Sequence, residues 1–66
     1  MGEVQKRLQV LGIDRVEAKT DLSRTTIYRK IKEGEFPPGF KISRKRRVWE
    51  ETDIDNWISD LMQRAV

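Results

Sequence analysis

The sequence predicts a small α+β domain in which three short helices are combined with a two-stranded β-hairpin. Apolar residues recur at helical spacing in three separate stretches, which predicts the helices. A Pro-Pro pair followed by two β-prone stretches separates the second helix from the third, which predicts the hairpin. A chain of 66 residues has room for one modest core and no second domain.

Composition excludes several classes of protein. The chain contains no cysteine and no histidine, so it has no disulfide, no thiolate metal site and no imidazole for catalysis or metal binding. We therefore expect no enzymatic activity, no cofactor, no metal and no small-molecule ligand. No apolar run approaches the ~20 residues that span a bilayer, and the first ten residues lack the apolar core of a signal peptide. We expect a cytoplasmic protein with no membrane partner.

Positive charge is concentrated in the middle of the chain. Residues 23–49 hold nine cations and two carboxylates, a net charge of +7, whereas the remaining residues sum to −4. A basic surface of this kind suggests a polyanionic partner. A merely solvated basic face is the alternative.

The domain is expected to occupy residues 8–64, between a flexible arm over residues 1–7 and a short C-terminal end at 65–66. Residues 3–11 fit two patterns, a helical stripe and a short alternating strand.

The first helix is expected over residues 15–20. Asp14 is placed to cap it and Glu17 to complete a capping box, while Ile13 can form a hydrophobic staple. A helix this short is marginal alone and must pack on a neighbour.

A second helix is expected over residues 24–33. Asp21 tolerates the left-handed conformation of a tight turn, Ser23 is a good N-cap, and Gly34 suits the position after the helix. Two short helices joined by such a turn form a helix-turn-helix, whose second helix enters the major groove of DNA.

The apolar stripe of this second helix is narrow. Ile27 and Ile31 lie one turn apart and should face the core, and hydrogen-bonding side chains occupy much of the remaining surface. We expect Ile27 and Ile31 to anchor the helix while the polar arc is offered to base edges and phosphates.

The hairpin is expected to have strands at residues 40–42 and 47–49, with its tip at 43–46. A two-stranded hairpin is unstable alone, so its apolar face must rest on the helices. Phe36, before the proline pair, is expected to fold back over the helix pair.

The last helix has the clearest pattern. Thr52 is expected to cap it, and Ile54, Trp57, Ile58 and Leu61 follow one face. Its other side is acidic or neutral, so we expect a structural helix that closes the core with Trp57 rather than a surface for phosphate.

The stretch "LSRTTIYRKIKEGEFPPGFKISRKRRVWEETDIDNWI" resembles the AlpA-type phage regulators and their excisionase relatives, small members of the MerR-like winged-helix group. The resemblance covers residues 16–61 and rests on "LSRTTIYR", "EGEFP", Trp49 at the end of the second strand, and "DIDNWI". It implies a small winged helix-turn-helix in which the hairpin is the wing. Two departures are Asp21, where the family usually has glycine, and a wing tip "SRKRR" that lacks the usual glycine.

The predicted DNA-binding residues lie on the second helix and at the wing tip. The two helix arginines can read guanine or clamp phosphate, and the threonine methyls can touch thymine. Tyr28 either donates to a phosphate or packs beneath the wing, and Lys30 is expected to face solvent. The wing cations suit a narrow minor groove or a phosphate clamp, with one of the last two turned inward. The set is Arg24, Thr25, Thr26, Tyr28, Arg29, Lys32, Arg44, Lys45, Arg46 and Arg47.

By this resemblance the chain is expected to bind double-stranded DNA sequence-specifically in a phage or mobile element, in the cytoplasm and associated with the nucleoid. It would regulate transcription, act as an excisionase, or both. Expected partners besides DNA are a site-specific recombinase (integrase) and further copies binding cooperatively. The alternative is an adaptor that docks on a recombinase or polymerase through the C-terminal helix. Double-stranded RNA fits less well, because a recognition helix is poorly suited to its grooves.

Overall fold

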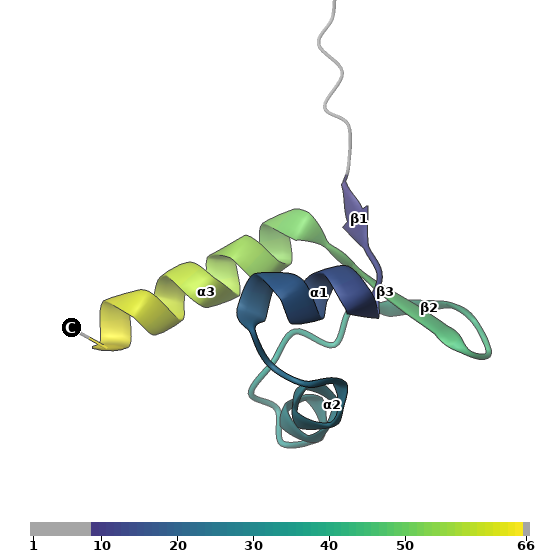
Figure 1. The fold of residues 1–66 in the computed structure, drawn as a ribbon, viewed down its shortest axis with the longest axis horizontal. Helices are drawn as coiled ribbons and strands as arrows, with labels where there is room; N and C mark the ends of the chain where they lie inside the picture. The colour runs from purple at the N-terminus through teal and green to yellow at the C-terminus, as the bar shows by residue number, and fades with distance from the viewer. Residues whose placement is uncertain (1–8, 66) are drawn as a thin grey trace, which may run out of the picture.

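Three helices and a three-stranded antiparallel sheet make up residues 9–65, the part of the chain that the computed structural model describes (Figure 1). The predicted α+β winged helix-turn-helix is confirmed. The expected arm at 1–7 lies outside the described residues. In chain order the elements are β1 (Val10–Leu11), α1 (Ile13–Thr20), α2 (Arg24–Lys32), β2 (Phe40–Ser43), β3 (Arg46–Glu50) and α3 (Glu51–Ala65).

The sheet has one strand more than the predicted hairpin. Its order is β1-β3-β2, with Leu11 opposite Trp49 and Phe40 opposite Val48. Residues 3–11 fitted both a helical and a strand pattern, and the strand pattern is therefore correct for Val10 and Leu11. Pairing with β1 makes β3 the central strand, and this places the wing beside the start of α1.

The core lies between the sheet and the helices. Ile27 is fully buried and Ile31 packs partly buried against the core, as predicted. The buried cluster consists of Leu11, Val16, Ile27, Phe36, Trp49 and Ile54.

Trp49, rather than Trp57, is the tryptophan at the centre of the core. Trp49 is fully buried on the central strand, and its indole N–H donates to the carbonyl of Pro37 at 2.7 Å. Trp57 is half-buried, contacts Phe36 edge-on at 4.7 Å between ring centroids, and donates to the Glu35 carbonyl at 2.9 Å. Phe36 is buried in the same core cluster as Val16 of α1 and Ile27 of α2, and it also contacts α3 through this ring pair. Helical spacing shows that Trp57 lies on the apolar side of its helix. It does not show whether Trp57 is buried more deeply than Trp49, which lies on a strand.

The turn between α1 and α2 forms as predicted. Asp21 has φ 63° and ends α1, and the Ser23 hydroxyl accepts from the Thr26 N–H at 3.2 Å. Gly34, with φ 75°, follows the last turn of α2.

Both predicted caps of the outer helices are wrong. α1 is capped by Gly12 without a side-chain hydrogen bond, so Asp14 lies inside the first turn. α3 begins at Glu51, directly after β3, so Thr52 also lies inside its helix. The reason is the sheet, because the Glu51 N–H donates to the Gln9 carbonyl at 2.8 Å and the backbone of β1 and β3 determines where each helix starts.

Gly39 is required where the chain enters the wing. Its φ is 63°, and a Cβ there would lie 2.3 Å from the Val48 carbonyl oxygen and 2.9 Å from the Trp49 ring. Any larger residue would push β2 away from β3.

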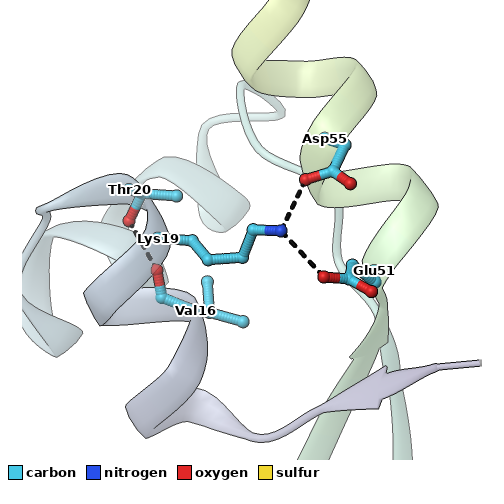
Figure 2. Close-up of polar contacts among 5 residues, drawn as sticks. All are labelled: Val16, Lys19, Thr20, Glu51 and Asp55. Carbon is cyan, nitrogen blue, oxygen red and sulfur yellow. Dashed lines mark hydrogen bonds and ion pairs between the residues drawn. The ribbon is translucent and has the colours of Figure 1, made fainter.

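One lysine joins α1 to α3 (Figure 2). The Lys19 ammonium lies 2.9 Å from a Glu51 oxygen and 2.7 Å from an Asp55 oxygen. The hydrogen bond with Asp55, followed by that with Glu51, raises the pKa of Lys19 above its ordinary value. In the same turn the Thr20 hydroxyl donates to the Val16 carbonyl at 2.8 Å.

Candidate nucleic-acid interface

The outward side of α2 is polar and exposed. Thr25, Arg29 and Lys32 are exposed and follow i, i+4, i+7 spacing, so they share one side of the helix. Burial of Ile27 on the opposite side holds the helix on the core. This ridge consists of residues long or small enough to reach or approach a base edge.

Two polar residues of α2, Thr26 of the predicted set and Lys30, are engaged within the molecule. Thr26 is half-buried, and its hydroxyl lies 3.0 Å from the Ser23 hydroxyl that caps the helix. Lys30 was expected to face solvent, but it is half-buried and its ammonium lies 3.7 Å from a Glu35 oxygen. The Lys30 side chain is long enough to extend past the last turn of α2 to Glu35, which explains this contact.

The wing carries three exposed cations and one internal one. Arg44, Lys45 and Arg46 are exposed at or beside the two-residue turn, and a register shift lies between Lys41 and Ser43 on the opposite strand. Arg47 is half-buried and donates to the Pro38 carbonyl. Of Arg46 and Arg47, the second is therefore the less exposed one.

Arg47 and Tyr28 connect the wing to α2. The guanidinium carbon of Arg47 lies 6.0 Å from the centroid of the Tyr28 ring, at the outer range of a cation–π contact. The Tyr28 side chain remains 39% exposed. Tyr28 thus packs beside the wing residue Arg47 and still reaches the surface, so neither alternative considered for it is contradicted.

An open groove of about 530 Å³, which we call the cationic groove, lies between the start of α1, the start of α2 and the wing. Five of its ten lining residues are cations and one is a carboxylate, Asp14. The lining residues are Val10, Gly12, Ile13, Asp14, Arg15, Arg24, Tyr28, Lys45, Arg46 and Arg47. Concentrated cations of this kind, with guanidinium groups among them, suit phosphate oxygens.

Sequence reasoning missed Arg15. It belongs to the groove because pairing of β1 with β3 brings the start of α1 to the wing, where an Arg46 nitrogen lies 3.7 Å from the position a Cβ on Gly12 would take. A strand of two residues gives almost no periodic signal, and Arg15 lies outside the basic segment 23–49, so the sequence offered no signal for this side chain.

Asp14 moderates the charge of the groove. Its carboxylate lies 3.5 Å from the Arg24 guanidinium, at the first residue of α2. Both side chains are well exposed, at 88% and 59%, so the pair contributes little to stability and is readily exchanged for another anion.

Residues 9–65 hold no cluster of three or more carboxylates that could bind a metal ion. None of the described helices is long and apolar enough to cross a bilayer.

The model of one protein family, described as "Prophage CP4-57 regulatory protein (AlpA)", matches residues 9–63. The chain belongs to the AlpA family. The AlpA match runs from β1 into α3, so all three walls of the cationic groove lie inside it. The family is one of phage regulatory proteins, in agreement with the resemblance found in the sequence.

A phage protein is also similar to this AlpA-family chain. It is the "Uncharacterized protein ORF88" of Enterobacteria phage P4, 40% identical over 38 residues, which cover 58% of this chain and 43% of that protein. The chain thus matches less than half the length of this relative. No solved structure is significantly similar to the chain.

Proposed function

We propose that this AlpA-family protein binds duplex DNA sequence-specifically and regulates transcription in a phage or mobile element, directs excision, or does both. The cationic groove beside the exposed ridge of α2 supports this most directly. In this arrangement α2 lies in the major groove and the wing lies on the adjacent minor groove or backbone.

The two sides of the interface would divide the work. Thr25, Arg29 and Lys32 on the outward ridge of α2 face the base edges, where arginine contacts to guanine provide discrimination. Arg15, with the wing cations, lies in or beside the cationic groove and takes phosphates, which provides affinity without sequence choice. The Arg47–Tyr28 contact joins the two sides.

The test begins by selecting binding sites from random-sequence duplex DNA and measuring affinity for the selected and a scrambled duplex. Replacing Arg29 by Ala should cost about 1–3 kcal/mol of discrimination and relax preference at one position. Lys30→Ala is the matched control, because this cation lies on the same helix but faces Glu35. Wild-type strength and selectivity in an Arg24→Ala/Arg29→Ala variant would overturn the proposed reading helix.

An excision assay distinguishes a role in promoter control from a role in excision, which the fold alone does not. The purified protein would be added to a site-specific integrase of the phage or mobile element that carries its gene and to DNA with both attachment sites of that element. Excised product that depends on Arg29 supports the excision role. Binding at a promoter without any effect on excision assigns the protein to transcription.

A further inference from the structure

The C-terminal end of α3 extends past the core. In Figure 1 the yellow end of α3 projects beyond α1 and α2, away from the wing. Residues 60–65, which we call the α3 tail, are all exposed. The apolar stripe of α3 nevertheless continues into the tail, where Leu61 is 44% and Met62 64% exposed. Apolar side chains that continue along a helix beyond the core suggest a contact with another protein.

A second groove, of about 580 Å³, runs along this tail. Phe36, Pro37, Trp57 and Leu61 supply its apolar wall, and Asp60 and Arg64 are among its charged residues. Neither Asp60 nor Arg64 forms an ion pair within residues 9–65. We call it the α3 groove. It shares no lining residue with the cationic groove.

We propose that the α3 tail docks antiparallel against the α3 tail of a second copy of this chain on neighbouring DNA. This inference rests on the proposed DNA binding and adds the surface through which two bound copies cooperate. The arrangement of charges on the tail indicates that a second copy of the chain binds there. Asp60 and Arg64 are four residues apart on one flank of the helix, beside the stripe that contains Leu61.

Two-fold symmetry makes that flank complementary to itself in one orientation only. When two identical helices pack antiparallel, the same flank of each helix meets its counterpart. A crossing near Met62 then brings Asp60 of each copy beside Arg64 of the other copy, twice in one interface. In a parallel pair the two-fold axis would place this flank of the two copies on opposite sides of the seam, so Asp60 and Arg64 would not meet across it.

The size of the tail indicates when this contact operates. Stable interfaces bury about 1,200–2,000 Å² in total, and fewer than two exposed helical turns cannot supply that area. The contact is therefore weak between free molecules and becomes effective when DNA holds two copies at high local concentration. The tail projects away from the wing, so docking leaves both DNA-binding faces free.

Charge exchange provides the first test. Affinity is measured for duplexes carrying one or two selected sites, and the ratio gives the cooperativity. Asp60→Arg and Arg64→Asp should each reduce two-site binding to that of independent sites. The double variant Asp60→Arg/Arg64→Asp should restore cooperativity, and so should an equimolar mixture of the two single variants. Asp53→Arg, at the other end of α3, is the matched control and should leave the ratio unchanged.

Cross-linking provides the second test, because the chain has no cysteine of its own. Leu61→Cys should form a disulfide-linked dimer on the two-site duplex, since Leu61 lies on the seam close to the two-fold axis. Gln63→Cys is at the same level on the opposite side of the helix and should cross-link much less. Equal cross-linking of the two variants would overturn the antiparallel seam.

The two proposals can fail separately. If the wild-type chain does not bind even the one-site duplex, the proposed function fails. If one-site binding is normal and cooperativity is absent or insensitive to the charge variants, the inferred self-docking fails. The apolar tail would then be left for another protein, such as a recombinase.

Discussion

The two grooves of this small domain are nearly equal in size but opposite in chemistry. The cationic groove is about 530 Å³ and is lined by five cations and one carboxylate, whereas the α3 groove is about 580 Å³ and has an aromatic and aliphatic wall with balanced charges. Volume therefore says little about their roles. The lining separates a surface suited to a polyanion from one suited to a protein.

The two grooves also differ in how the chain builds them. The cationic groove collects residues from β1 and α1, from α2 and from the wing, so it exists only when the sheet has formed. The α3 groove is made by α3, the segment that follows α2, and Lys30 near the end of α2. Variants that damage the sheet should thus eliminate the first groove, while variants on α3 should spare it.

Trp49→Ala should have the largest effect. Removing a fully buried aromatic side chain costs about 3–5 kcal/mol, a large part of the stability of a domain this small. We expect loss of the cooperative thermal transition in circular dichroism and loss of DNA binding.

Trp57→Ala is the matched comparison within the α3 groove. Because Trp57 is half-buried, its removal should cost less than that of Trp49 and leave a folded protein that still binds a one-site duplex. Equal destabilisation by the two substitutions, measured by urea unfolding, would contradict the assignment of Trp49 to the centre of the core.

The wing variant Arg44→Ala/Lys45→Ala/Arg46→Ala tests the cationic groove next. Each lost phosphate contact lowers the log–log salt slope by ~0.9, so three lost contacts lower its magnitude by about 2.7. Affinity should fall for selected and scrambled duplexes alike, because phosphate contacts carry no sequence information. Titrations at several salt concentrations measure this, and a slope equal to that of the wild type would remove the wing from the interface.

Much of this fold was predictable from local signals. The Ser23 cap, the left-handed Asp21 and the Ile27–Ile31 stripe depend on residues close in sequence, and all three are as predicted. The starts of α1 and α3 were not predictable in this way. They are determined by pairing between β1 and β3, which joins residues about forty positions apart.

The candidate interface likewise has a part that local sequence signals predict and a part that depends on long-range strand pairing. The exposed ridge of α2 follows from helix geometry alone, and its exposure agrees with the prediction. Arg15 and the internal position of Arg47 depend on how the sheet is assembled, and only the second was partly foreseen from strand alternation. Local periodicity places side chains on an element, but long-range pairing decides which elements share a groove.

Asp14→Asn should have a smaller effect of opposite sign. Removing this carboxylate from the cationic groove should tighten binding to any duplex about three- to tenfold, since two unit charges 4 Å apart interact by about 1 kcal/mol even in water. Asp53→Asn on α3 removes the same charge away from the groove and should change affinity less, so equal gains from both variants would indicate an effect of net charge alone.

Lys19→Met should have the smallest effect and tests the link between the helices that carry the two grooves. Lys19 of α1 binds Glu51 and Asp55 of α3, and these carboxylates raise its pKa in the folded protein (Figure 2). A group whose folded pKa is raised contributes its stability below the unfolded pKa and loses it as pH rises through the folded pKa. The free energy of unfolding of the wild type should therefore exceed that of Lys19→Met at pH 7, and the difference should shrink above roughly pH 10.4, the ordinary lysine pKa. Urea unfolding of both proteins from pH 7 to pH values above the ordinary lysine pKa measures this difference, and subtracting one protein from the other cancels the titration of other groups. Lys41→Met, on an exposed strand position, controls for the loss of a charge. A difference that stays constant with pH would mean that Lys19 joins α1 to α3 by the packing of its aliphatic stem and not by its charge.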